Sequence, residues 1–249
     1  MNYPSIKKYL GENWLKKQFE EIDKKDWVKE GIPKDKVSND IAFSVLEKID
    51  EVIVKFENIK NFSKWIEEAK TSKNFEDCLF ELMALENLLL KSDLVELKPD
   101  NSVSGFVLEA LVKKGEVNFF LEMTKLKSME GSTQNKVEKL FGKARNKFRG
   151  LQGVHFIGVF NFFEFEDDIM KPLPKFNLLK RMINSRFERG SNSSILAFVL
   201  VNIYVAYNPK LNKTFVQKRF DIVNKPENRG GLPLSFFESI FDVNEFIEE

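Results

Sequence analysis

The sequence has little of the chemistry that marks a zinc or disulfide site, because its 249 residues include one cysteine and one histidine. A single cysteine, Cys78, excludes an internal disulfide and fits a reducing interior. A single histidine, His155, argues against structural zinc, which needs several Cys or His ligands. Both residues have apolar neighbours in the sequence. We therefore expect Cys78 to be a buried small hydrophobic residue and His155 to be a core or edge residue of a strand.

An excess of charge of either sign is also absent, because 39 Lys and Arg residues stand against 38 Asp and Glu residues. Any basic surface must therefore be local. The apolar run from Ile195 to Val201 is far shorter than the roughly 20 residues that span a bilayer. The N-terminus, MNYPSIKKYLGENW, lacks the apolar segment of a signal peptide. We expect a cytoplasmic protein without a membrane partner.

The chain is rich in apolar residues, including 25 phenylalanines, and can build a large core. Apolar residues at helical spacing predict a helix over residues 40–56, with Ser38 and Asn39 as cap candidates, and another near residues 62–69. No strand pattern precedes residue 70. We therefore expect a helical N-terminal extension over residues 1–70 and an α/β domain over residues 71–249.

The α/β domain begins with a predicted helix over residues 75–91, FEDCLFELMALENLLLK, with Asn74 as its N-cap and acidic residues in its first turn. Glu81 lies at the edge of the buried stripe of this helix. It is either a boundary residue that reaches solvent or a site residue. A short strand over residues 94–97 and a loop over residues 98–104 follow.

A β-hairpin is predicted over residues 105–127, GFVLEALVKKGEVNFFLEMTKLK, because two β-prone runs flank a Lys-Lys-Gly-Glu turn. A two-residue turn at residues 114–115 pairs Val112 with Val117. A turn one residue longer would move every side chain of one strand to the other face.

Two glutamates share one face of this hairpin. Glu109 lies diagonal to Glu122, at roughly 7–8 Å between backbones. Two carboxylates at that separation could bind one hard cation, which prefers oxygen ligands. The alternative is that both are ordinary solvent-facing strand residues.

A basic amphipathic helix is predicted from Ser132 or Thr133 to Gly150, with apolar residues at helical spacing on one side. Its polar positions carry a local excess of cations that could contact phosphates, although a charged helix face is more often simply solvated. The cations are Lys136, Lys139, Lys143, Arg145, Lys147 and Arg149.

The rest of the chain alternates strands and helices. Nearly continuous apolar runs predict buried strands over residues 154–163 and 195–207. A helix is expected over residues 176–188 between them. An edge strand over residues 214–223 and a final helix over residues 234–246 complete the prediction.

This order of elements resembles the core of the PD-(D/E)XK nuclease superfamily, the restriction-endonuclease-like fold. The resemblance covers roughly residues 75–163. The first helix resembles the opening helix of many such nucleases, with Glu81 at the position of their acid. FFLEMTKLK is similar to the strand with the (D/E)XK tripeptide, which places Glu122 at its acid. The resemblance implies a mixed central sheet flanked by helices, and a Mg²⁺-dependent deoxyribonuclease that hydrolyses phosphodiester bonds.

The chain departs from the family pattern at two of three core positions. The aspartate that binds the metal in the family falls on Gly105, and Asp100 lies five residues earlier, in a loop. The family's lysine, which helps to activate the attacking water, falls on Thr124, and Lys125 points to the opposite face of a regular strand. The resemblance therefore implies a lost or rearranged site.

A rearranged site would recruit neighbouring residues. The candidates are Glu122 with Glu109 or Asp100 on Mg²⁺, Glu81 in support, the Thr124 hydroxyl, and Lys125 or Lys127 near the scissile phosphate, where a bulge would have to re-aim the lysine.

Three functions remain open. The first is a nuclease-fold protein that has lost catalysis and binds DNA or a partner through its basic helix. The second is an active Mg²⁺-dependent DNA endonuclease with migrated catalytic residues. The third is a non-catalytic protein-interaction module. A homodimer or a protein partner is compatible with this sequence.

Overall fold

The computed structural model describes residues 2–24, 34–99, 105–126, 133–164, 174–190, 194–208 and 213–241. The chain divides into two compact units. The first unit comprises Met1–Glu86, Phe160–Lys171 and Asn202–Lys218, and the second comprises Asn87–Val159, Pro172–Val201 and Arg219–Glu249. The expected domain boundary near residue 70 stays a prediction.

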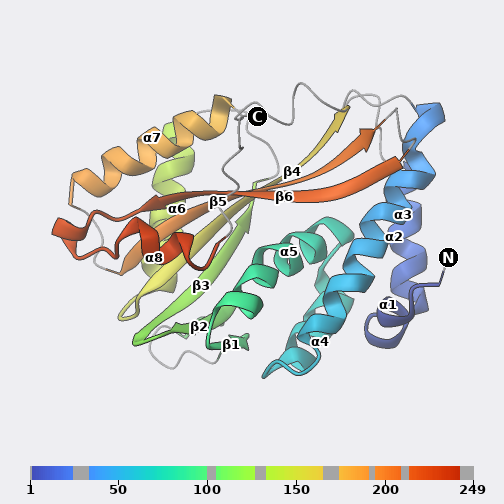
Figure 1. Cartoon of the computed structure of the whole chain (residues 1–249), viewed down its shortest axis with the longest axis horizontal. Coiled ribbons are helices and arrows are strands. Elements are labelled where there is room, and N and C mark those ends of the chain that lie inside the picture. The colour runs from blue at the N-terminus through green and yellow to red at the C-terminus, as the bar shows by residue number, and fades with distance from the viewer. Residues whose placement is uncertain are drawn as a thin grey trace. The chain divides into compact units, whose positions relative to one another are not determined.

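The first unit begins with helices, as expected. They are α1 (Pro4–Tyr9), α2 (Glu12–Lys24), α3 (Lys34–Ile53), the 3-10 turn η2 (Val54–Phe56) and α4 (Phe62–Ser72) (Figure 1). The expectation that Ser38 or Asn39 caps α3 is wrong, because the helix already begins at Lys34. None of the described helices is long and apolar enough to cross a membrane.

Helix α5 (Phe75–Lys91) and strand β1 (Leu94–Leu97) have the predicted bounds. Asn74 caps α5, since its side-chain oxygen accepts a hydrogen bond from the Asp77 backbone N–H at 2.9 Å. Cys78 is buried, as expected of a small hydrophobic residue in the apolar stripe of this helix.

Six strands form one mixed sheet in the order β1-β2-β3-β4-β5-β6. After β1 come β2 (Ala110–Lys114), β3 (Val117–Lys125), β4 (Gly153–Glu164), β5 (Ile195–Asn208) and β6 (Lys213–Asn224). Strands β1 and β2 pair antiparallel, as do β2 and β3, whereas β3 and β4 are parallel. The predicted α/β class and the edge position of β6 are confirmed.

The β2–β3 hairpin turns at residues 115–116, so that Lys114 pairs with Val117. The expected pairing of Val112 with Val117 is wrong by two positions. The physical reason is Gly115, which has a φ of 58° and adopts this left-handed conformation without strain, so it starts the turn. Because the shift is an even number of residues, each side chain keeps its predicted face.

Several other predicted bounds are too long. Strand β2 begins at Ala110, not at residue 105, because residues 105–109 contain bends and a single bridge. Helix α6 (Thr133–Lys147) begins at Thr133 and ends before Gly150. Helix α7 (Pro174–Glu188) agrees closely with its prediction. Helix α8 (Leu234–Glu238) ends early, and residues 242–249 lie outside the described residues.

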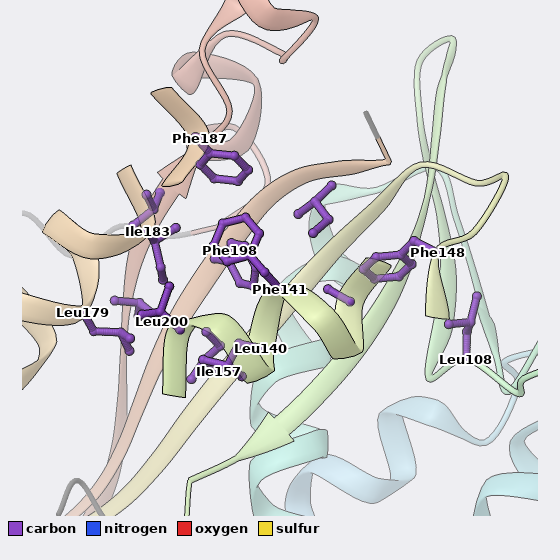
Figure 2. Packing of buried hydrophobic residues seen from close by; sticks show 14 residues of the cluster. Leu108, Leu140, Phe141, Phe148, Ile157, Leu179, Ile183, Phe187, Phe198 and Leu200 are labelled. Atoms are coloured by element: carbon purple, nitrogen blue, oxygen red, sulfur yellow. The ribbon is translucent and has the colours of Figure 1, made fainter. Parts of the chain in front are cut away.

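Helices α6 and α7 pack a phenylalanine-rich core in the second unit. The Phe141 ring of α6 lies 5.4 Å from the Phe187 ring of α7 and 4.7 Å from the Phe198 ring of β5, measured between centroids. Figure 2 shows these three rings together, with Phe148 nearer to the hairpin. Buried aromatic residues of this size dominate the apolar area removed from water, so this core fixes α6 relative to its strands.

Gly153 allows α6 to return closely to the sheet. A Cβ atom at this position would lie 2.2 Å from the ring of Phe148, which follows the last turn of α6. The missing side chain therefore makes room for a fully buried phenylalanine at the point where the chain enters β4.

Candidate functional site

Strand β3 and helix α6 bury one carboxylate between two lysines. The Glu122 side chain is 2% exposed, and its Oε1 lies 2.9 Å from Nζ of Lys143. Its Oε2 lies 3.3 Å from Nζ of Lys147. The two lysines are one helical turn apart, so both reach the same carboxylate. A carboxylate removed from water needs compensating charge, and these lysines supply it.

Thr124 joins this arrangement to the neighbouring strand. Its Oγ1 accepts a hydrogen bond from Lys143 Nζ at 2.9 Å and shares another with His155 Nε2, also at 2.9 Å. The parallel register sets His155 of β4 opposite Glu122 of β3. We call Glu122, Thr124, Lys143, Lys147 and His155 the Glu122 cluster.

His155 is a neutral member of the Glu122 cluster. It is fully buried, so the prediction of a core residue is confirmed. Burial, followed by the positive charges of Lys143 and Lys147, lowers the pKa of His155 to about 3. At neutral pH the ring therefore orients the Thr124 hydroxyl without adding a third positive charge.

An exposed aromatic residue lies beside the cluster. Nζ of Lys147 lies 5.4 Å from the centroid of the Phe106 ring and donates a hydrogen bond to the Val107 carbonyl at 3.3 Å. Phe106 is 45% exposed and Val107 is 54% exposed. Large apolar side chains with this exposure, next to cations, can contact a planar ligand as well as a charged one.

Helical geometry places four lysines of α6 in one row. Lys136, Lys139, Lys143 and Lys147 recur three or four residues apart, on the flank of α6 that meets Glu122. We call these four residues the lysine row. Lys139 is exposed and has no ion-pair partner among the described residues.

Of the two arginines of the predicted basic helix, Arg145 lies on the other flank of α6 and Arg149 lies in the turn that follows the helix. Arg145 and Arg149 are exposed, and no ion pair engages either within the part of the chain that the structure describes. The flank of Arg145 is also that of Glu138, whose Oε2 lies 3.4 Å from Nη2 of Arg186 on α7. The six predicted cations therefore do not form one surface: four lysines lie on one flank of α6, Arg145 lies on the other, and Arg149 follows the helix.

The other hairpin glutamate has its own lysine. Glu109 lies in the bend before β2, where its Oε2 pairs with Nζ of Lys98. The backbone N–H of Lys98 also donates to the Glu109 carbonyl at 2.9 Å. The cation expected between Glu109 and Glu122 stays a prediction.

Three further site candidates are Lys125, Asp100 and Lys127, and none of them is a described member of the Glu122 cluster. Lys125 ends β3 on the face opposite Glu122, because side chains alternate along a strand. Asp100 and Lys127 lie outside the described residues. Across the described ranges, no group of three or more His, Cys, Asp or Glu side chains could hold a metal ion.

Glu81 belongs to the first unit and has partners there. Its Oε2 accepts a hydrogen bond from the Trp65 indole N–H at 2.7 Å, and its Oε1 pairs with Nζ of Lys73. Glu81 is buried, and its role as a site residue stays a prediction. A shared pocket with Glu122, a residue of the second unit, stays a prediction.

No protein-family model matches the chain, and no curated protein matches it. Among solved structures, SfsA from Pyrococcus furiosus in complex with Ca²⁺ is similar at 14% sequence identity and a TM-score of 0.26. The match covers 57% of this chain and 61% of the SfsA chain, which is less than two thirds of its length. A likeness of this extent decides nothing about this chain, whose function is inferred from its own geometry.

Sequence reasoning missed how Lys143 and His155 serve the site. It placed Lys143 on a basic helix and Glu122 on a strand, but nothing in the sequence spacing joins them. The available signal was the pair Lys143 and Lys147, four residues apart on the flank next to the buried stripe of α6. Phe106 was read as part of a strand, and it lies instead in the exposed segment before β2.

Proposed function

We propose that this protein binds nucleic acid, DNA in the first instance, across the lysine row and Phe106. The proposal assigns it a restriction-endonuclease-like core of the PD-(D/E)XK kind, in which β3 carries Glu122 and α6 connects β3 to the parallel strand β4. The observation that carries the binding function is the position of Lys147, between the buried Glu122 carboxylate and the exposed Phe106 ring.

The chemistry of these side chains suits a nucleic acid. Lysine ammonium groups in a row neutralise successive phosphates and release counterions. An exposed aromatic ring beside them offers a face on which an unpaired base can stack, which contributes about 1–3 kcal/mol per base. Both features lie in the second unit, on α6 and on the segment before β2.

Glu122 then holds the lysines in place. Its ion pairs restrict Lys143 and Lys147, which otherwise would lose side-chain freedom when a phosphate binds. Lys143 keeps 43% of its side chain exposed and can still contact a ligand. In this function, the Glu122 cluster supports the binding surface.

Binding of a fluorescent 30-nucleotide DNA, single-stranded and duplex, measured by anisotropy, tests this function. Replacing Lys139 and Lys143 by alanine should weaken binding at 50 mM salt by about tenfold or more, and should reduce the salt slope by about 2, one for each lost phosphate contact. Lys113→Ala, which removes an exposed cation of β2 with no described ion pair, is the matched control. Absence of binding at 50 mM salt, or equal loss in both variants, contradicts the proposal and favours a protein-interaction module.

A second function, Mg²⁺-dependent DNA cleavage, is favoured by the position of Lys143. Its Nζ lies 2.9 Å from Glu122 Oε1 and 2.9 Å from Thr124 Oγ1. In this function, Lys143 would substitute for the family lysine, whose position falls on Thr124. Glu122 would be a metal ligand, and Lys143 would orient the attacking water. Mg²⁺ would stabilise the charge that develops on the phosphate.

Incubation of supercoiled plasmid with Mg²⁺ or Mn²⁺ separates the two functions. Nicking by the wild type that is lost in Glu122→Gln and in Lys143→Ala, but retained in Lys113→Ala, establishes the nuclease and replaces the binding-only proposal. DNA binding without nicking in either metal supports binding alone.

A further inference from the structure

A second positively charged site lies between α6 and α7, away from the lysine row. The two helices line a cavity of about 150 Å³ in the second unit that is open to solvent. Three arginines of α7 line it together with polar residues of α6 and α7, and the residues that matter here are Gln134, Glu138, Arg181, Ser185, Arg186 and Arg189. One water requires roughly 10–15 Å³ of such space, so a tetrahedral anion fits with room for water.

The spacing on α7 directs these groups to one side. Arg181, Ser185 and Arg189 follow each other at intervals of four residues, and therefore form a single row on the helix surface. All three are exposed. Neither Arg181 nor Arg189 has an ion-pair partner within the described ranges of the chain. Two guanidinium groups thus flank the cavity with their donors available.

Arg186 is fixed at the same cavity and is incompletely bonded. Its Cζ lies 5.9 Å from the centroid of the Phe141 ring, and its Nη2 lies 3.4 Å from Glu138 Oε2. Its Nε is buried without a hydrogen-bond partner among the described residues. A buried N–H donor without a partner is costly and rare in folded proteins. Because Nε is closed to solvent, an anion in the cavity would bind the outer nitrogens of Arg186, whose side chain is 30% exposed.

The charge balance of the cavity selects an anion. Among the described residues, Glu138 is the one acid that lines it, and this carboxylate is already engaged by Arg186 and by Gln134, whose Nε2 lies 3.4 Å away. Three guanidinium groups against one carboxylate leave two positive charges. Guanidinium forks match the oxygen geometry of a phosphate better than that of a monoatomic anion.

We propose that the cavity between α6 and α7 binds a phosphate group through Arg181, Arg186 and Arg189, with Gln134 and Ser185 as neutral partners. The phosphate belongs either to a small phosphorylated molecule or to the backbone of a nucleic acid. The site is independent of the lysine row, because the two share no residue.

Titration with inorganic phosphate tests the site, with sodium chloride at equal ionic strength as the reference. Phosphate should raise the unfolding temperature of the wild type and give a saturable heat of binding by calorimetry. In the Arg181→Gln, Arg189→Gln double variant, the affinity should fall by about tenfold or more, since each lost charge-assisted contact is a large part of such binding. Lys113→Gln, which removes one charge elsewhere in this unit, should behave as the wild type.

The binding result can be interpreted even when the double variant is less stable than the wild type. The unfolding temperature of the double variant in chloride reports its folding, and Arg181→Lys with Arg189→Lys keeps the charge but removes the fork. Absence of saturable phosphate binding to the wild type overturns the inference, as does equal affinity in wild type and double variant. Phosphate binding without DNA binding supports this site and contradicts the proposed function.

The source of the phosphate follows from the same variants. If the double variant loses affinity for DNA as well as for inorganic phosphate, the cavity holds a backbone phosphate. If only phosphate binding falls, the ligand is a small phosphorylated molecule.

Discussion

Each unit of the protein buries one glutamate between two lysines. In the first unit, the carboxylate of Glu86 lies 2.6 Å from Nζ of Lys55 and 2.7 Å from Nζ of Lys218. In the second unit, Glu122 contacts two lysines at 2.9 and 3.3 Å. The local chemistry of the two carboxylates is therefore nearly the same.

The surroundings of the two carboxylates differ. Lys218 is 15% exposed and also donates to the Met83 carbonyl at 3.0 Å, so the protein itself occupies this ammonium group. Burial alone would raise the pKa of Glu86, but hydrogen bonds from Lys218 and Lys55 outweigh it and lower the pKa to about 2. Lys55 is 38% exposed, but a second acid, Glu51, also engages its Nζ at 3.3 Å. Lys143, by contrast, is 43% exposed and has no second acid as a partner among the described residues. An acid with two lysines therefore indicates a site only where one of its cations is exposed and is not held by another acid.

The largest expected effect lies in the first unit. Lys218→Ala leaves Glu86 buried with one lysine and should lower the free energy of unfolding by about 3 kcal/mol, because a buried charge loses a partner. Urea unfolding measures it. DNA affinity should not change, since the lysine row lies elsewhere in the chain.

Lys17→Ala is the control for that variant. Lys17 is 67% exposed and lies 3.8 Å from Glu21, an exposed pair that contributes at most about 1 kcal/mol. Equal losses in the two variants, or a fall in DNA affinity in Lys218→Ala, would remove the distinction between the two glutamates.

The second effect concerns acid stability of the Glu122 cluster. His155 is the single histidine of the chain, and its pKa is lowered from 6.5 to about 3 by burial and then by Lys143 and Lys147. Between pH 6.5 and about pH 3, His155 is protonated in the unfolded chain but stays neutral in the folded protein. The stability is therefore fully present above pH 6.5 and is lost as the pH falls, by about 3 kcal/mol at pH 4.

Comparison of the wild type with His155→Gln isolates this titration, because carboxylates titrate in both. Urea unfolding at pH 7.5 and pH 4 should show that the free energy of unfolding falls less in the variant than in the wild type, by about 3 kcal/mol. Parallel pH profiles would show that His155 is not held neutral, and would contradict its role beside Thr124.

The third effect tests the exposed rim of the cluster. Phe106→Ala should weaken binding of single-stranded DNA by about 1–2 kcal/mol, within the range for loss of one stacked base, and should affect duplex DNA less. Leu234→Ala, which removes another exposed apolar side chain of the second unit, should leave both affinities unchanged. Equal loss for single strands and duplex would contradict base stacking on Phe106.

The smallest effect sharpens the role of Glu122. Glu122→Gln weakens the ion pairs that hold Lys143 and Lys147 and should weaken DNA binding about threefold, because the two lysine side chains then lose freedom when they bind a phosphate. Glu116→Gln, in the exposed hairpin turn, is the control. Tighter binding in Glu122→Gln would show that the negative charge beneath the lysines matters more than their fixed position, and would contradict the supporting role of Glu122.

Much of the fold could be predicted from periodicity. Helix α5 and strand β1 were predicted with the observed bounds, because Asn74 and the apolar stripe mark them locally. The hairpin register was wrong by two residues, since the choice between two adjacent turns depends on the φ of Gly115. The segment 105–109 is β-prone, but most of it does not join the sheet, because strand pairing is decided by tertiary context.

The site was predictable only in part. Glu122 was identified from its strand, and the cations of α6 from their number. What joins them is the packing of α6 on β3, which brings residues 19 or more positions apart into contact. The accessible arginines of α7 also required the structure, because the cavity that they line includes residues of another helix.

The close approach of Gly153 to Phe148 limits which residues can replace Gly153 during evolution. Even alanine at Gly153 would push against an aromatic ring that anchors the end of α6, and so would displace Lys143 and Lys147 without altering any charge. In any descendant of this chain that keeps the lysine row in register with β3, this position should remain glycine.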